Sequence, residues 1–316
     1  MGYSRWDAAS TATYTATSAL YSKAISFKDV FINRNLITAL DPKHITMRES
    51  RRSEANPNPT PIILALDDTG SMGTIAHNIA AHGLGTLIKE IFDRTPVTDP
   101  HIMFMAVGDV EYDHSPLQAS QFETDYTMVE QLSQLFIEGN GGGNFSESYN
   151  LPWHFAQFHT SADAFEKDGR KGYLFTFGDE LVPPDLTSWE LDKVYGKRQE
   201  QVRTNRQLLD DLVSKYHVFH LMIEEGNFMK HAKQKVAGDW IALLGENAIP
   251  VSNYKALSEI IISIMQVNEG ADKQTVIDSW SDQTKKIVEY ALKNFKGFKE
   301  LYEANTTDNE VAPELF

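Results

Sequence analysis

The sequence of 316 residues contains no cysteine. Disulfides, thiolate zinc sites and cysteine nucleophiles are therefore excluded, and this composition is typical of a reducing compartment. No run of about 18 apolar residues is present, so we expect no membrane-spanning helix. The first ten residues, MGYSRWDAAS, lack the apolar run of a secretory signal. Together these absences predict a cytoplasmic protein without membrane contact.

Basic residues are also in short supply. Lys and Arg number 29 against 44 Asp and Glu, which gives a net charge of −15. Because an acidic surface repels phosphate backbones, we expect no nucleic-acid partner unless a local basic patch overrides the average. Hydrophobic residues make up 41% and aromatic residues 11% of the chain, which is enough for a large core and excludes global disorder.

From residue 61 onward, apolar runs of strand length alternate with segments of helical period. This alternation predicts an α/β protein with a Rossmann-like three-layer fold, in which helices cover both faces of a mostly parallel central sheet. Ligands of such sheets bind at the carboxyl ends of the strands. We expect strands at 62–66, 101–107, 117–122, 172–177 and 217–223, and helices at 74–92, 126–137, 148–158, 199–216 and 254–267.

Residues 1–60 differ from the alternating region, 61–268, and are expected to form an N-terminal arm. Prolines before residue 61 favour an extended lead-in to the first strand. The aromatic residues Trp6, Phe27 and Phe31 are expected to fill grooves on the main domain. The alternative is a docking arm for a partner or for a second copy of the chain.

Residues 269–316 are expected to form a C-terminal extension. The apolar spacing of 276–298 predicts one long helix, which either packs on the sheet domain or serves as a contact surface. Residues 303–316 carry acidic but no basic side chains, and we expect a tail there.

The segment PIILALDDTGSMG (61–73) runs from an apolar strand into a polar loop. Oxygen-bearing side chains occupy alternate positions at Asp67, Thr69 and Ser71. Alternate residues on an extended segment point the same way, so one carboxylate and two hydroxyls converge. Such a set suits a hard cation such as Mg²⁺, which takes oxygen ligands.

Three further polar loops follow predicted elements. A glycine-rich loop leads to Asn144, Ser146 and Glu147, while Asp109 and Asp179 each follow a glycine directly after an apolar strand. Singly these signals are weak, because a strand-terminal Asp is often a helix cap and a glycine-rich loop is often a turn. In this order on these strand ends, they predict one shared site.

The run DDTGSMG after an apolar strand resembles the metal-ion-dependent adhesion site of the von Willebrand factor type A domain. The first loop of that family is Asp-x-Ser-x-Ser with Thr allowed in the middle, and Asp67, Thr69 and Ser71 match it. The run GGGNFSES resembles a variant second loop that supplies a Glu, here Glu147. The third loop departs from the family's Thr-Asp-Gly pattern, because Thr-Phe-Gly precedes Asp179. The runs DDTGSMG, GGG…ES and YLFTFGDE also resemble an uncharacterised bacterial and phage group of type A proteins.

The resemblance implies a protein-binding module that is not an enzyme. Its cation would be Mg²⁺ or Mn²⁺, with few carboxylate ligands and one position open to an Asp or Glu of a partner protein. Asp68 is expected to face away, at the surface or behind the ligands. Asp179 is expected to bind directly or through water. The implied ligands are Asp67, Thr69, Ser71, Glu147 and Asp179, with Asp109, Asn144 and Ser146 as further candidates.

Two other functions stay open. Asp67 at a strand end could be the nucleophile of a metal-dependent phosphohydrolase, although the haloacid-dehalogenase type needs a second Asp where Thr69 stands. The chain could also be a structural or assembly protein with a degenerate metal site. No P-loop and no Gly-x-Ser-x-Gly run is present. His154 and His159 are five residues apart on an expected helix, a poor spacing for one shared metal.

Overall fold

The structure, a computed structural model, describes residues 33–70, 84–138, 146–198 and 200–297, together with 7, 9, 10, 12, 13, 72, 75, 78 and 79. Several residues named above lie outside the described ones: Trp6, Phe27, Phe31, Ser71, Asn144 and the segment beyond 297.

Six strands form the central sheet, in the order β4-β3-β2-β6-β7-β8. Neighbouring strands pair in parallel, except that β4 runs antiparallel to β3. Numbered along the chain, this is the order 3-2-1-4-5-6 of a Rossmann-like sheet, so the predicted fold class is confirmed. The strands are β2 (Thr60–Asp67), β3 (Pro100–Val107), β4 (Leu117–Ala119), β6 (Gly172–Gly178), β7 (Tyr216–Ile223) and β8 (Ala248–Val251).

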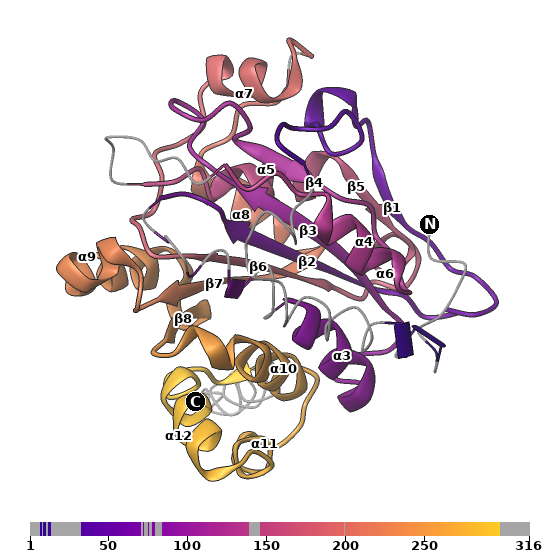
Figure 1. Ribbon diagram of the computed structural model, residues 1–316, viewed down its shortest axis with the longest axis vertical. Helices are drawn as coiled ribbons and strands as arrows, with labels where there is room; N and C mark the ends of the chain where they lie inside the picture. Colours follow the sequence, from indigo (N-terminus) through magenta and orange to yellow (C-terminus); the bar gives the residue numbers. More distant parts are fainter. Residues whose placement is uncertain are drawn as a thin grey trace, which may run out of the picture.

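Helices cover both faces of the sheet (Figure 1). Because successive strand residues point to opposite faces, Ile62 and Leu64 of β2 enter one core while Ile63 and Ala65 enter the other. The first face is covered by α3 (Leu84–Arg94), α4 (Thr127–Ser133) and α10 (Leu257–Asn268), and the second by α5 (Asn150–Phe158), α7 (Ser188–Tyr195), α8 (Asn205–Leu212) and α9 (Asn227–Leu244).

The prediction of a single helix over 276–298 is wrong. The chain forms α11 (Lys273–Asp278) and α12 (Asp282–Ala291) instead. Between them, the indole N–H of Trp280 donates to the Ser263 hydroxyl at 2.8 Å, and the Arg94 guanidinium lies 3.4 Å from the centre of the Trp280 ring. These tertiary contacts hold Trp280 against α3 and α10, and the chain turns there.

Other boundaries also differ from the prediction. The helix expected over 199–216 begins only at Asn205, because Thr204 caps it with reciprocal bonds to Gln207, and it ends at Leu212. The helices α7 and α9 and the strand β8 were not predicted. Among the described residues, the remaining elements are β1 (Arg48–Ser50), β5 (Thr160–Ala162), α6 (Asp163–Lys167) and the short 3₁₀ turns η2 (Pro42–His44), η4 (Gly245–Asn247) and η5 (Tyr254–Ala256).

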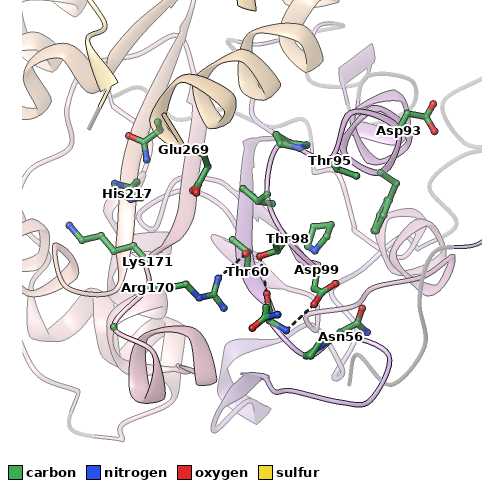
Figure 2. A pocket seen from close by; sticks show the side chains of 18 residues that line it. Asn56, Thr60, Asp93, Thr95, Thr98, Asp99, Arg170, Lys171, His217 and Glu269 are labelled. Atoms are coloured by element: carbon green, nitrogen blue, oxygen red, sulfur yellow. Dashed lines mark hydrogen bonds between the residues drawn. The ribbon is translucent and has the colours of Figure 1, made fainter. Parts of the chain in front are cut away.

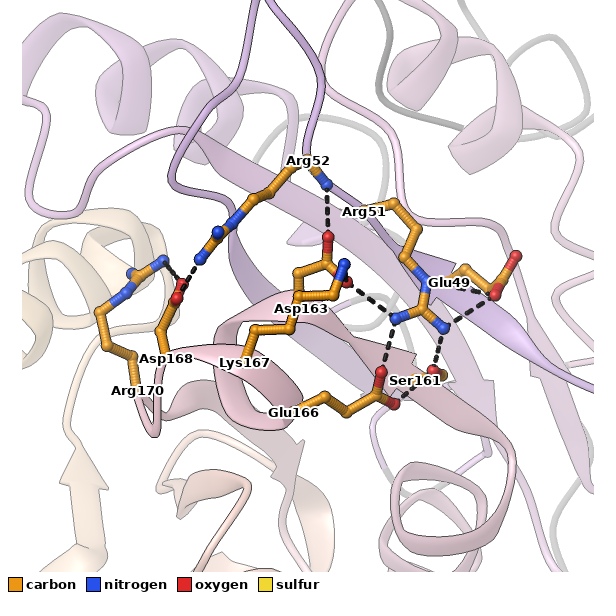
Figure 3. Close-up of polar contacts among 9 residues, drawn as sticks. All are labelled: Glu49, Arg51, Arg52, Ser161, Asp163, Glu166, Lys167, Asp168 and Arg170. Atoms are coloured by element: carbon orange, nitrogen blue, oxygen red, sulfur yellow. Dashed lines mark hydrogen bonds and ion pairs between the residues drawn. The ribbon is translucent and has the colours of Figure 1, made fainter.

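Within the N-terminal segment, residues 33–60 contact the sheet domain. Its strand β1 pairs in parallel with β5 in a separate two-stranded sheet. Figure 3 shows the Arg51 guanidinium between Asp163 and Glu166, at 3.0 and 2.6 Å, with Arg52 paired to Asp168. The division of the chain at residue 60 stays a prediction. Among the described residues, no helix has the length and apolar character needed to cross a bilayer.

Candidate metal centre

Asp67 is the last residue of strand β2 and lies at the edge of the sheet formed by the carboxyl ends of the parallel strands. The eight residues of β2 are all buried, as expected for a central parallel strand. In the register, Asp67 lies opposite Val107 at the end of β3, and Leu66 lies opposite Phe177 near the end of β6. The loops that carry Asp109 and Asp179 therefore leave the sheet at the same edge as Asp67.

The Asp67 carboxylate is held on both oxygens. Its Oδ1 accepts hydrogen bonds from the Thr69 backbone N–H at 2.9 Å and from the Thr69 hydroxyl at 2.6 Å. Its Oδ2 accepts from the Tyr149 hydroxyl at 2.6 Å. Thr69 thus lies beside Asp67, as the Asp-x-Thr-x-Ser spacing predicts, while Ser71 lies outside the described residues.

Tyr149 is a residue of the site that the sequence interpretation missed. Its ring packs edge-on against His220 and Trp240, with centroids at 4.9 and 5.7 Å. It reaches Asp67 across Gly178, where a Cβ would lie 2.0 Å from the Tyr149 hydroxyl oxygen. The available signals were the position of Tyr149 two residues after Glu147 and the glycine before Asp179.

Glu147 and Asp179 come from the second and third loops, and both are buried. Burial raises the pKa of Glu147, and the negative charge of Asp67 raises it further. Burial likewise raises the pKa of Asp67, with the charge of Asp179 as the next cause. The folded chain therefore places Asp67 within electrostatic reach of both residues.

Asp179 is oriented by the start of α9. Its Oδ2 accepts a hydrogen bond from the Phe228 backbone N–H at 2.8 Å. A Cβ at Gly226, the residue before α9, would lie 2.2 Å from the Asp179 Cβ, so the close approach requires glycine there. The helix that holds Asp179 is one the sequence did not predict.

Asp109 and Ser146 line a small cavity of about 150 Å³ next to this edge. The Oδ1 of Asp109 accepts from the Glu111 backbone N–H at 2.6 Å, and the Asp109 backbone N–H donates to Asp113 at 2.7 Å. Asn144 lies outside the described residues.

The site is far richer in carboxylates than the resemblance implied. Asp68 is only 2% exposed and accepts from the Glu138 backbone N–H. Of its two expected positions, at the surface or behind the ligands, the surface one is therefore wrong. Burial raises the pKa of Asp68 and of Asp113. The buried acidic side chains at this edge are Asp67, Asp68, Asp109, Asp113, Glu147, Asp179 and Glu180.

Three carboxylate oxygens among these acids are buried without a hydrogen-bond partner in the described part of the chain. Asp109 Oδ2, Asp113 Oδ1 and Glu147 Oε2 are buried and have no hydrogen-bond donor among the described residues. A buried carboxylate oxygen without a donor is costly unless a cation neutralises it or the carboxyl group holds a proton. Because the donor set contains only carboxylate and hydroxyl oxygens, it suits Mg²⁺ or Mn²⁺ better than a softer metal.

A larger pocket, of about 850 Å³, lies at the opposite edge of the sheet. Figure 2 shows Thr60, Arg170, Lys171 and His217 around it, at or near the amino ends of β2, β6 and β7. Seven residue steps of β2 separate Thr60 from Asp67, about 23 Å at 3.3 Å per residue. This pocket is therefore separate from the carboxylate site.

The prediction that His154 and His159 are badly spaced for one metal is wrong. One potential ligand atom from each, and one from Glu200, all lie within 4.8 Å of one another. Helix α5 ends at Phe158, and His159 has φ −122° and ψ 17°, so helical spacing does not apply to it.

Comparison with known proteins gives structural likeness only. No protein-family model and no curated protein matches the sequence. The pilus adhesin SpaC from Lactobacillus rhamnosus GG matches with a TM-score of 0.43 at 10% identity, over 77% of this chain and 31% of that one. Proximal thread matrix protein 1 from the mussel byssus matches at 0.42 and 10%, over 72% and 47%.

A von Willebrand factor type A protein from Catenulispora acidiphila matches with a TM-score of 0.36 at 12% identity, over 66% of this chain and 42% of that one. The present chain spans less than half the length of each of these three.

Proposed function

We propose that this chain is a protein-interaction module with an adhesion-type metal site. Asp67, Thr69 and Ser71 from the first loop, Glu147 from the second and Asp179 from the third would hold Mg²⁺ or Mn²⁺. The observation that supports this most is the convergence of three loops on one sheet edge, where the buried Glu147 Oε2 has no donor among the described residues. When bound, the cation would neutralise the carboxylates and offer a position to a partner's Asp or Glu.

Each side chain has a defined part in this proposal. Thr69 positions the Asp67 carboxylate through two hydrogen bonds, and Tyr149 orients it from the other side. Phe228 fixes Asp179 through its backbone N–H. Asp109, Asn144 and Ser146 remain further candidate ligands.

Calorimetry with Mg²⁺ and Mn²⁺ tests the metal site. The wild-type chain is expected to bind one ion, and Asp67→Ala to lose that binding. Asp210→Ala, at an exposed position of α8, is the matched control and is expected to bind like the wild type. Equal, negligible heats for the wild type and Asp67→Ala would contradict the proposal.

A pull-down with and without EDTA tests the partner. We expect an acidic partner surface that is captured in Mg²⁺ and released by EDTA, and that Asp67→Ala does not capture. Robust turnover of a phosphate ester that disappears in Asp67→Ala would instead support a phosphohydrolase.

A second candidate function is an assembly protein whose contacts do not need the metal. Both Asp67 oxygens already accept hydrogen bonds from protein donors, which favours this candidate. In addition, the negative charge of seven buried acidic groups would leave a bound cation with little attraction for the carboxylate of a partner. The arm (1–60), acting between copies of the chain, and the C-terminal extension would then supply the contacts. A partner or self-association retained in EDTA would support this candidate.

A further inference from the structure

Two buried histidines and a half-buried glutamate lie close together at α5 and the segment between α7 and α8. His154 lies in α5, His159 directly follows it, and Glu200 comes from the later segment. His154 is 0% exposed and His159 is 5% exposed. His159 Nε2 lies 3.3 Å from Glu200 Oε2. The three potential ligand atoms lie within 4.8 Å of one another.

Backbone carbonyls fix the protonation of both rings. One ring nitrogen of His154, Nε2, lies 3.2 Å from the Gln201 carbonyl, and His159 Nδ1 lies 3.1 Å from the Thr46 carbonyl. A carbonyl only accepts, so each of these nitrogens carries the proton. The lone pairs of neutral rings are therefore on His154 Nδ1 and His159 Nε2, neither of which has a hydrogen-bond partner among the described residues.

In the singly protonated ring, the His159 lone pair is on Nε2, which lies 3.3 Å from a Glu200 carboxylate oxygen. Two acceptors at 3.3 Å repel each other unless a cation lies with them or the ring takes a second proton. A backbone carbonyl on the outer nitrogen of a histidine is the arrangement that orients metal-bound imidazoles. Burial lowers the pKa of His154 to about 4, so this ring is neutral at pH 7.

We propose that His154 Nδ1, His159 Nε2 and a Glu200 carboxylate oxygen form a second metal site, which takes Zn²⁺. Two imidazoles and one carboxylate are a ligand set that zinc uses, with a fourth position for water or another group. Bonds of 2.0–2.1 Å in a tetrahedron separate ligand atoms by about 3.4 Å, close to the His159–Glu200 distance. The other two separations between ligand atoms are at most 4.8 Å. Side-chain shifts on the order of 1 Å would shorten them to the tetrahedral value.

The surroundings fit a structural site. The Tyr195 ring stacks on His159 at 4.7 Å between centroids and restricts its orientation. The nearby Arg203, whose positive charge opposes a cation, is itself paired with Asp211 at 3.2 Å. The ion would join α5 to the segment between α7 and α8, and we expect it to stabilise that junction.

The test is a titration of the full chain, purified with a chelator, with ZnCl₂ in saturating Mg²⁺, so that Mg²⁺ occupies the oxygen site. We expect one Zn²⁺ per chain and a higher melting temperature. His154→Gln, His159→Gln and Glu200→Gln should each weaken binding at least about 10-fold. His231→Gln, at an exposed position of α9, and Asp67→Ala should bind Zn²⁺ like the wild type.

Co²⁺ in place of Zn²⁺ gives a readout on the wild type alone, which no folding defect of a variant can confuse. Four-coordinate Co²⁺ with imidazole ligands has much stronger visible absorption than six-coordinate Co²⁺ with oxygen ligands. Absence of saturable Zn²⁺ binding, or binding that the two histidine variants leave unchanged, would overturn the proposal. The His159–Glu200 contact would then be an imidazolium–carboxylate ion pair only.

Discussion

Tyr149 reaches Asp67 only because residue 178 has no side chain. We expect Gly178→Ala to push Tyr149 away and to lower the free energy of unfolding by about 1–3 kcal/mol, the usual cost of an extra methyl in a tight core. Gly238→Ala, in open space on α9, is the matched control and should stabilise slightly. Urea unfolding of both variants is the measurement. A Gly178→Ala chain as stable as the wild type would show that the close contact relaxes freely.

The hydroxyl of Tyr149 gives a second prediction at this scale. Tyr149→Phe leaves the buried Asp67 Oδ2 without its donor, and we expect a loss of about 1–3 kcal/mol in EDTA. Saturating Mg²⁺ should reduce that loss, because a cation at Asp67 compensates its charge. The loss should therefore differ between urea titrations in EDTA and in Mg²⁺.

Tyr173→Phe is the control for Tyr149→Phe. This variant also removes a 2.6 Å hydrogen bond from a tyrosine hydroxyl to a carboxylate, here that of Glu269. Glu269, however, lines the pocket at the opposite edge of the sheet. The loss in Tyr173→Phe should be the same with and without Mg²⁺. Equal Mg²⁺ dependence of the two variants would contradict a cation at Asp67.

Among the elements, α6 and the lead-in to β2 depend on one buried carboxylate. Asp163 is 3% exposed and accepts from Arg51, from Lys167 and from the Arg52 backbone N–H (Figure 3). We expect Asp163→Asn to lower the free energy of unfolding by about 1–3 kcal/mol, because charged hydrogen bonds are lost in a buried place.

Limited proteolysis checks the Asp163→Asn prediction by location. Cleavage within residues 48–60 should become faster, since Asp163 ties this segment to α6. Glu49→Gln is the control, because Glu49 pairs with the same Arg51 but is 39% exposed, and it should cost less than about 1 kcal/mol. Similar cleavage rates in both variants would contradict the role given to Asp163.

For the whole molecule, the buried acids predict how stability depends on pH. Burial and neighbouring charges raise the pKa of Asp67 to about 7 and that of Glu147 to about 10. Such groups hold protons in the folded state that the unfolded chain releases above about pH 4.3, so stability falls as the pH rises from there toward the folded pKa. Buried His101 and His154 and half-buried His217, with pKa values lowered to about 4, oppose this only below about pH 6.5.

We therefore expect the free energy of unfolding in EDTA to fall from pH 7 to pH 9, by about 1.4 kcal/mol per pH unit for each proton retained. Mg²⁺ should flatten this decline, because it replaces the protons as counter-charge. Glu147→Gln should flatten it without Mg²⁺, whereas Glu54→Gln, at an exposed position, should not. A rise in stability over this range in EDTA would contradict the protonated cluster.

The sequence predicted the core of the fold well where the pattern was local. Long apolar runs and helical periods identified five of the six central strands and the helices that carry strong apolar stripes. It missed α9, whose buried residues Met229, Val236 and Trp240 are widely spaced among polar ones. It also joined α11 to α12, because the contacts that hold Trp280 come from α3 and α10, far away in the chain.

The sequence by itself determined that Asp67 and Thr69 lie together at a strand end, because alternation along an extended segment is a local property. Only the tertiary structure decided how many acids surround them. Burial and neighbouring charge depend on which loops pack together, and no local pattern reports that Asp68 is buried or that Tyr149 takes one Asp67 oxygen. For the same reason, the meeting of His154, His159 and Glu200 appears only once α5 has ended and the chain has folded back on it.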